Sequence, residues 1–398
     1  MHYRITETGD RRITETGDYR IIEFYVILEE KNRYSIELRN RYFDLVKILT
    51  NRKKSCSWEY NRIGGCGRGS ISLSMTKDEI ETYIGPDYDV RIYKGLGTEK
   101  ELLYRGYVET YKPTETDTES IGITTNGYLG QLQRINIDQT YTSKYVDVIV
   151  KDILDDYVLP NTSITYNSAD IESTDFVVDS IDFNTTAIDV IKTLGELAGN
   201  YEWGVSRNLK FFFKKPASTT KNYLRFKKDI TKFDSTNDYS QIINRLIIKG
   251  AGDPPTEYTS NNTESQAQYG IRTKIISNSA IMSTEVAQQY GTMILAEKAR
   301  IQVRGTVTAI NVSTFFENEI PIGKLGILKQ SIPLTNKYGT FKYGKTKKYG
   351  GGIMSYDIND IQYILRDEDL GVTIGVGRPR PDIADQIKQL EFELSQKT

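Results

Sequence analysis

Few side chains of this chain have the types and spacing that catalysis requires. The chain has one histidine, His2, whereas a Ser-His-Asp or Cys-His site needs an ordered imidazole within hydrogen-bond reach of the nucleophile. The second residue of a chain is a poor place for such a group. The two cysteines, Cys56 and Cys66, are too few for the common kinds of zinc site. The sequence therefore predicts neither a metal nor a cofactor.

The two cysteines leave two redox states open. A disulfide between Cys56 and Cys66 is geometrically feasible at their spacing. The alternative is a pair of reduced, partly buried thiols, as in proteins that fold in a reducing compartment. We expect the reduced pair, because the N-terminus is charged from Arg4 onward and lacks the apolar run of a signal peptide.

A glycine-rich segment, Gly64-Gly65-Cys66-Gly67-Arg68-Gly69, invites comparison with a phosphate-binding loop. It lacks the Gly-Lys-Ser/Thr ending of a nucleotide-binding loop. We interpret it as a turn in a β-rich domain, where glycine permits a positive φ and a close approach by another backbone segment.

Paired acids are the remaining route to an enzyme. Asp152, Asp155 and Asp156 lie on or beside a predicted helix, and Glu317 and Glu319 lie in a predicted loop. A glycosidase needs two carboxylates in a cleft at a defined separation, one of them with a raised pKa. Solvent-exposed helix and loop positions account for these acids, so we predict that the chain is not an enzyme.

The elements that carry these residues begin with a repeat of eight residues at the N-terminus. Each unit is a short strand sequence followed by Thr-Gly-Asp, in which glycine suits a tight turn. Because the period is even, Ile5, Ile13 and Ile21 fall on one face of an extended meander. Such a ribbon is too small to bury a core. We predict that residues 1–23 form an attachment arm whose isoleucines contact a neighbouring protein or the chain's own first β domain.

Composition indicates a β-rich protein of several domains. The chain has 398 residues, 28 of them tyrosine, and 31 glycines against 10 prolines, and tyrosine favours strands and half-buried surfaces. Lysine and arginine (52) nearly balance aspartate and glutamate (53), so no overall attraction to nucleic acid or acidic membranes is implied. No stretch approaches the roughly 18 apolar residues of a membrane span.

Hydrophobic periodicity divides the chain into a β-rich, a mixed and a second β-rich region. Short alternating strands with turns between them predict a barrel or sandwich in the first region. These strands are expected at 24–39, 57–60, 70–74, 89–93, 102–110, 120–125 and 127–133.

Helical periodicity appears next, at 144–157 and at 186–198, where Thr185 or Thr186 can cap the second helix and Gly199 ends it. A hairpin follows. The second β-rich region begins near Leu224 and contains a long loop and one helix that Ser283 caps. The ranges are 201–213 for the hairpin, 244–250, 305–312 and 371–377 for strands, 251–268 for the loop and 284–299 for the helix.

Two segments near the C-terminus suggest contacts with other molecules. Ile383, Ile387, Leu390 and Leu394 follow the spacing of a coiled-coil seam, but two heptads are short, so packing on the chain's own β domain is an alternative. A Lys-Tyr-Gly motif occurs three times within 337–350. It suits either the phosphates of passing DNA or a solvated loop at a subunit boundary.

The order of these features resembles that of the baseplate hub proteins of contractile-tailed bacteriophages, the tail hub or late control D-like family, which is related to the hubs of injection systems. The resemblance covers most of residues 50–398. The segments that carry it are Trp58-Glu59, Gly64–Gly67, Val90–Tyr93, Leu103–Val108, Thr186–Ala198, Tyr201–Trp203, Leu209–Phe213, Asn244–Gly250, Tyr269–Arg272 and Ile374–Pro381.

This resemblance implies a β-rich α+β fold with two tail-tube-like β-barrel domains, a small α+β domain between them and a C-terminal helix. The corresponding ranges are 1–23 for the arm, 24–140 and 221–376 for the barrels, 141–220 for the α+β domain and 377–398 for the helix. The octad repeat is not part of the usual hub pattern.

The resemblance also implies a structural, non-enzymatic homotrimer in the tail baseplate of a virion, assembled in the host cytoplasm. Such a hub joins a six-fold tail tube or tube-initiator protein to a three-fold central spike, contacts neighbouring baseplate proteins and lines the channel through which phage DNA leaves. Two alternatives stay open. A distal-tail or receptor-binding adaptor would form a six-fold ring, and a tail-associated cell-wall hydrolase would degrade peptidoglycan.

Overall fold

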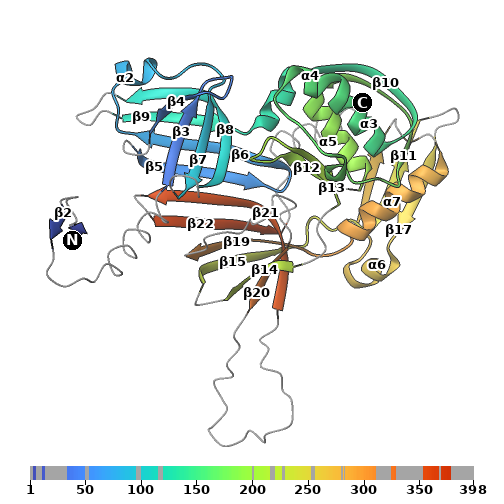
Figure 1. Ribbon diagram of the computed structural model, residues 1–398. Coiled ribbons are helices and arrows are strands. Elements are labelled where there is room, and N and C mark those ends of the chain that lie inside the picture. The colour runs from blue at the N-terminus through green and yellow to red at the C-terminus, as the bar shows by residue number, and fades with distance from the viewer. Residues whose placement is uncertain are drawn as a thin grey trace, which may run out of the picture. The chain divides into compact units, whose positions relative to one another are not determined.

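The structure is a computed structural model (Figure 1). It describes residues 3–5, 11–13, 34–49, 53–95, 100–114, 120–199, 201–215, 220–225, 229–251, 256–278, 281, 283–310, 324–328, 353–366 and 369–377. The chain divides into two compact units. Unit 1 comprises residues 1–59, 66–128 and 363–370, and unit 2 comprises residues 60–65, 129–362 and 371–398.

Unit 1 is built around an antiparallel β-sheet (Figure 1). The strands follow the spatial order β5-β6-β9-β8-β7-β3-β4, so that β4 is the last strand of this series. Their bounds are β3 Tyr34–Arg39, β4 Leu45–Ile48, β5 Lys53–Asn61, β6 Gly64–Leu73, β7 Asp89–Lys94, β8 Glu101–Thr114 and β9 Ser120–Asn126.

Alternating side chains form the core of unit 1. In β6 and β9, Ile71 and Leu73 pair with Ile123 and Ile121, and all four side chains are buried. Each buried isoleucine or leucine contributes about 1.5–3 kcal/mol. The C-terminal segment of the unit joins this core where Tyr363 stacks on Trp58, with ring centroids 5.3 Å apart. The expected strands of this region are confirmed at 34–39, 57–60, 70–73, 89–93, 102–110 and 120–125, whereas residues 24–33 lie outside the described residues.

Residues Tyr128–Arg134 form a 3-10 helix, so the strand expected at 127–133 is wrong. Tyr128 and Leu132 are both buried, and a spacing of four residues brings two side chains to one face of a helix. A short helix, α2 (Lys77–Glu81), was also not expected. The side chain of Thr76 and that of Glu79 form a capping box at its start, which is a signal that the sequence does contain.

The first two octads pair with each other. Strand β1 (Tyr3–Ile5) is antiparallel to β2 (Arg11–Ile13), with Tyr3 opposite Ile13 and Ile5 opposite Arg11. The strand character predicted for the repeat is thus confirmed for two of its units. Ile21 lies outside the described residues.

Unit 2 contains a series of strands that are antiparallel except for β14, which pairs with β20 in parallel. Its strands follow the order β15-β19-β22-β21, and β20 and then β14 continue from β21. Buried side chains from neighbouring strands, such as Val307 and Ile374, are directly paired. The bounds are β14 Thr220–Arg225, β15 Ile230–Asp238, β19 Gln302–Ile310, β20 Lys324–Leu328, β21 Ile353–Arg366 and β22 Asp369–Gly377.

A mixed region precedes this sheet in the chain. It contains a long antiparallel pair of strands, a broken helix, one regular helix and the predicted hairpin β12–β13 (Figure 1). Its elements are β10 Asn136–Tyr145, α3 Val146–Ile153, a π-helical turn Leu154–Val158, α4 Leu159–Asn161, a 3-10 turn Ser168–Asp170, β11 Val177–Thr186, α5 Ala187–Leu197, β12 Glu202–Val205 and β13 Phe211–Lys214.

The helix predicted at 186–198 is confirmed, including its cap, since the Thr186 side chain accepts the backbone N–H of Asp189. The helix predicted at 144–157 starts later, because β10 extends to Tyr145, and it contains a π turn. Pro160 lies within α4, and the helical run ends at Asn161, one residue beyond it.

A three-stranded sheet forms the last part of unit 2, in the order β17-β16-β18. Strand β16 (Arg245–Lys249) and helix α7 (Thr284–Lys298), which Ser283 caps, confirm the predictions. The long loop expected at 251–268 is wrong, since β17 (Glu257–Asn261) and α6 (Thr263–Tyr269) lie in it. The polar composition of β17 reflects a strand with four of its five residues not buried. Strand β18 (Thr273–Ser277) completes the sheet.

The glycine-rich segment has the conformation expected for a turn with a close backbone approach. Gly64 and Gly65 have φ values of 115° and 75°. A Cβ atom at Gly65 would overlap the carbonyl of Val205, which lies beside it in a short parallel pairing of β6 with β12. Glycine is required at this position both for its φ and for the contact.

The described residues are β-rich with few helices, which confirms the coarse fold class. The thiols of Cys56 and Cys66 are unbridged, with exposed fractions of 1% and 3%. The expectation of reduced thiols is confirmed, and both are more deeply buried than expected. Burial raises the pKa of Cys56 to about 12, so this thiol is unreactive. The expected helix at 377–398 and the Lys-Tyr-Gly motifs lie outside the described residues.

The close approach at Gly65 can be tested against a glycine without it. Gly65→Ala adds a Cβ where backbone stands, whereas Gly270→Ala places one at φ 74° with no atom within 4 Å. Gly270→Ala should lower the free energy of unfolding by about 1–3 kcal/mol from backbone strain alone. Gly65→Ala should lower it clearly more, as measured by urea unfolding. Equal losses would contradict the role assigned to the Val205 contact.

Candidate functional site

The carboxylate of Asp89 in unit 1 has no solvent exposure and is bonded by three side chains. Arg91 Nε lies 2.6 Å from Oδ2, and Arg105 Nε lies 2.8 Å from Oδ1. The Tyr128 hydroxyl donates to Oδ1 at 2.8 Å. A buried charge is tolerated only when it is paired and hydrogen-bonded. The two arginines and the tyrosine together meet that requirement for the Asp89 carboxylate.

Aromatic rings enclose this ion pair. The Arg105 guanidinium lies 4.4 Å from the centroid of Phe43 and 5.5 Å from that of Tyr128, which are cation–π distances. Phe43 itself has a φ of 70°, unusual for a bulky residue. Its carbonyl accepts a hydrogen bond from Arg39 Nη1 at 2.9 Å. The cluster thus fixes the strained turn between β3 and β4.

A second buried acid, Glu37, lies on the adjacent strand. Arg39 Nη2 lies 2.7 Å from its Oε2, and Lys100 Nζ contacts its Oε1. Burial favours the neutral acid, but the hydrogen bonds and charges of Lys100 and Arg39 outweigh it, so the pKa of Glu37 lies below its ordinary value. Its carboxylate is therefore the bonded, charged form.

The two acids and the arginines bonded to them lie on three neighbouring strands, β3, β7 and β8. Glu37 is opposite Arg91 and Arg39 is opposite Asp89 between β3 and β7, while Arg105 on β8 is opposite Arg91. Residues directly opposite in a sheet share a face. Opposite charges therefore neighbour each other along β3 and β7 and across that pair of strands. Arg91 and Arg105 are like charges that share the carboxylate of Asp89.

Sequence reasoning missed this cluster, although a signal was present. Both β3 and β7 carry an acid followed two residues later by arginine, Glu37-Leu38-Arg39 and Asp89-Val90-Arg91. In a strand, such a pair lies on one face. The pattern indicates an ion pair on each strand, but it does not show that the two strands are neighbours.

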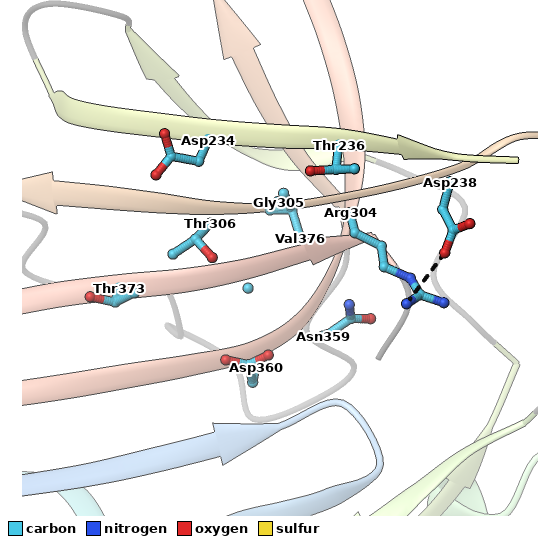
Figure 2. Close-up of a pocket in the computed structure, with 11 residues that line it drawn as sticks. Asp234, Thr236, Asp238, Arg304, Gly305, Thr306, Asn359, Asp360, Thr373 and Val376 are labelled. Atoms are coloured by element: carbon cyan, nitrogen blue, oxygen red, sulfur yellow. Dashed lines mark ion pairs between the residues drawn. The ribbon is translucent and has the colours of Figure 1, made fainter. Parts of the chain in front are cut away.

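In unit 2, polar side chains line a hollow of about 490 Å³ on the sheet of β15, β19, β22 and β21 (Figure 2). Figure 2 shows Arg304 reaching toward Asp238, with Nη1 and Oδ2 3.6 Å apart. The lining residues are Asp234, Thr236, Asp238, Arg304, Gly305, Thr306, Asn359, Asp360, Thr373, Gly375 and Val376.

The chemistry of this hollow is that of a polar contact surface. Three aspartates and three threonines line it beside one arginine, whereas pockets for small substrates are mostly apolar. Among the described residues, no group of three or more His, Cys, Asp or Glu side chains is arranged to hold a metal ion. Hydroxyl and carboxylate oxygens at an open sheet face suit hydrogen bonds from another polypeptide.

A further buried acid of unit 2 is Glu202 in β12. Arg62 Nε lies 2.6 Å from Glu202 Oε1, and Oε2 is buried without a hydrogen-bond partner. Burial, opposed by Arg62, raises the pKa of Glu202 above its ordinary value. This ion pair joins β12 to the turn between β5 and β6. The backbone N–H of Arg62, in the same turn, also donates to the Asn359 carbonyl at 2.6 Å.

The acids considered for glycosidase chemistry do not line the hollow. Asp152 pairs with Lys144 at 2.6 Å, and Asp155 accepts a hydrogen bond from the Tyr166 hydroxyl at 2.8 Å. Asp156 is exposed. These are ordinary surface contacts of a helix. Glu317 and Glu319 lie outside the described residues.

The residues predicted to form interfaces are only partly described. Ile5 and Ile13 lie in the paired strands β1 and β2. The others, which are Ile21, Ile383, Ile387, Leu390 and Leu394, lie outside the described residues. Their predicted roles stay predictions. In the described part of the chain, no helix has the length and apolar character to cross a membrane.

Three solved structures share this fold along nearly their whole length. A tail protein from Neisseria meningitidis matches with a TM-score of 0.62 and 8% identity, covering 87% of this chain and 97% of its own. The 43 kDa tail protein of prophage MuSo2 from Shewanella oneidensis gives 0.60 and 13%, covering 87% and 98%. The prophage tail protein gp18 from Listeria monocytogenes gives 0.55 and 15%, covering 91% and 99%.

No protein-family model matches this sequence, and no curated protein shows a significant sequence match. At 8–15% identity the three likenesses establish the fold and leave the function to be inferred. The chain therefore has the fold of these phage tail proteins.

The buried carboxylate should be far more important for stability than an exposed one. Asp89→Asn leaves Arg91 and Arg105 without their counter-charge and should lower the free energy of unfolding by about 3–5 kcal/mol. Glu109→Gln removes an exposed pair with Arg68 at 3.5 Å and should cost about 0–1 kcal/mol. Chemical denaturation of both variants tests this, and similar losses would contradict it.

Two buried glutamates should give opposite pH dependences. The lowered pKa of Glu37 means that its contribution is present above pH 4.5, the ordinary value, and is lost as the pH falls through the folded-state pKa. The raised pKa of Glu202 means that its contribution is present below pH 4.5 and is lost as the pH rises through the folded-state pKa.

These slopes can be measured as differences from Glu37→Gln and Glu202→Gln in urea unfolding across this pH range. The stability advantage of the wild-type chain over Glu37→Gln should shrink toward low pH. Its advantage over Glu202→Gln should shrink toward high pH. Two differences that move in the same direction would contradict the opposite pKa shifts assigned to Glu37 and Glu202.

Proposed function

We propose that this chain is a structural subunit of a phage tail baseplate, and more specifically its hub. The observation that carries the proposal is the fold shared with three tail proteins over 97–99% of their own lengths. A likeness of that extent includes the β-sheets and the mixed region together, and the order of sequence segments resembles that of hub proteins independently.

The two sheets support a hub with two tail-tube-like domains. Strands β3 to β9 all fall within 24–140, and β15, β19, β20, β21 and nearly all of β22 fall within 221–376. Under this proposal each range is one β-barrel domain, 141–220 is the α+β domain, 377–398 is the C-terminal helix and 1–23 is the arm.

A homotrimer would then present six β domains. That number matches a six-fold tail tube or tube-initiator protein on one side, while the three-fold axis matches a central spike on the other. The trimer would stand beside neighbouring baseplate proteins in the virion, after assembly in the host cytoplasm, and line the channel for phage DNA. The Lys-Tyr-Gly motifs of 337–350 would supply basic side chains near that path or at a subunit boundary.

A non-enzymatic role is part of the proposal. The described charged clusters are internal ion pairs that stabilise strands, as at Asp89 and Glu37. The hollow of unit 2 offers polar contacts to a polypeptide. Large tyrosine-rich β domains with few reactive groups suit an assembly subunit.

The oligomer is the decisive measurement. The chain has a mass of 45.4 kDa, so native mass spectrometry of the purified protein should give about 136 kDa for a trimer. A hexamer would favour a distal-tail adaptor. A stable monomer at high concentration, with no ring in electron micrographs, would overturn the hub proposal. Clearing of a peptidoglycan gel would instead support a cell-wall hydrolase.

A further inference from the structure

Strand β4 is the terminal strand of unit 1, and its outer edge has backbone groups directed away from β3. The Leu49 N–H donates to the Ile36 carbonyl at 2.8 Å. In an antiparallel pair the hydrogen-bonded positions alternate. Lys47 and Leu49 therefore use their backbone groups toward β3, and the N–H and C=O of Ile48 point outward. In the described part of the chain no strand pairs with that edge.

The side chains at this edge are unusually apolar. Tyr42, Leu45 and Ile48 have exposed fractions of 67%, 49% and 55%. The single lysine of the strand, Lys47, is held over the Tyr83 ring at 4.4 Å and bonds its hydroxyl. Natural sheets protect free edges with charge, proline or a covering segment. An uncovered edge with exposed leucine and isoleucine is instead typical of a strand that receives a partner.

The N-terminal hairpin lacks a third strand, and the free edge of β4 could pair with it. Strands β1 and β2 are three residues each and pair only with each other among the described residues. A two-stranded ribbon of that size is marginal in water and needs a third strand or a packing surface. Residues 1–59 belong to unit 1, so the hairpin precedes the same sheet whose edge is open.

The number and reach of these parts allow an exchange between copies. Twenty residues separate Ile13 from Tyr34, the start of β3, which is enough for a span of roughly 66 Å when extended. Every copy carries one hairpin and one β4 edge. A head-to-tail contact between unlike surfaces, in which each copy uses both, forms a ring when the rotation between copies closes. In the part of the chain that the structure describes, the hairpin and the outer edge of β4 each pair with no further strand.

We propose that the β1–β2 hairpin of one copy adds to the outer edge of β4 in a second copy of this chain. The strand addition extends the series β8-β7-β3-β4 across the subunit boundary and covers Leu45 and Ile48. This inference goes beyond the proposed function, because it identifies where the octad repeat binds and does not depend on the number of subunits.

Engineered cysteines test the pairing in the full chain. One protein carries Ile5→Cys or, for the other side of the strand, Arg4→Cys. A second carries Ile48→Cys. Mixing the two with oxidised glutathione should give a disulfide between copies, detected by mass spectrometry. The native Cys56 and Cys66 are 1% and 3% exposed and do not compete.

A matched control uses the exposed edge strand of unit 2. Ile275 in β18 is 53% exposed, close to the 55% of Ile48, so Ile275→Cys should cross-link no more than background. A third protein carries the arm cysteine and Ile48→Cys in one chain, and a disulfide that forms only within that chain, and not between mixed copies, would overturn the exchange between copies. No Ile48 cross-link from either arm position would overturn β4 as the binding site.

A proline variant gives an independent readout. Ile48→Pro removes only the outward N–H, so pairing with β3 should persist while the arm loses its edge. Cross-linking between the arm cysteine and Leu45→Cys should then fall at least tenfold relative to the same pair without Ile48→Pro. The circular dichroism spectrum of the variant should stay near native. Unchanged cross-linking would overturn the proposal, and a misfolded variant would leave the cysteine pairs to decide. If the protein is a trimer but no cross-link forms, the arm proposal fails while the hub proposal stands.

Discussion

The buried carboxylate of Asp89 is the constraint on which unit 1 depends. A charge without solvent exposure must be matched inside the protein, and here Arg91, Arg105 and Tyr128 do so from three different elements. Those contacts fix the register of β7 against β8, hold the helix that begins at Tyr128 and, through the ring of Phe43, position the turn into β4. Replacement of the pair by apolar groups would remove this specificity, because apolar contacts have no direction.

The pairing of acids inside the protein also bears on function. Acids that would be reactive in a cleft are here bonded to arginine and lysine within the sheet, and those on helix surfaces have ordinary surface partners. Among the described residues, polar side chains line a hollow in unit 2, and the outer edge of β4 in unit 1 pairs with no strand. Surfaces of these two kinds can bind polypeptides by side-chain and backbone hydrogen bonds, as the proposed structural role requires.

Local signals predicted local elements well. Helix α5 and helix α7 were predicted together with their caps, Thr186 and Ser283, because an N-cap and an apolar stripe lie within a few residues of each other. The errors occurred where tertiary contacts decide. Residues 127–133 contain apolar side chains that suit a strand, but Tyr128 is held in a helical turn by its bond to Asp89. Strand β17 has a polar sequence and exists because β16 supplies its hydrogen bonds.

The sequence by itself determined the β-rich class, the main helices, the glycine turn at Gly64 and Gly65 and the pairing of two octads, because each depends on neighbouring residues. Only the tertiary structure decided that Glu37-Leu38-Arg39 lies beside Asp89-Val90-Arg91, that Val205 approaches Gly65, and that β4 ends its sheet with Ile48 exposed. These facts depend on segments distant in the chain. Their pairing is fixed by burial and charge across the fold, which no local pattern contains.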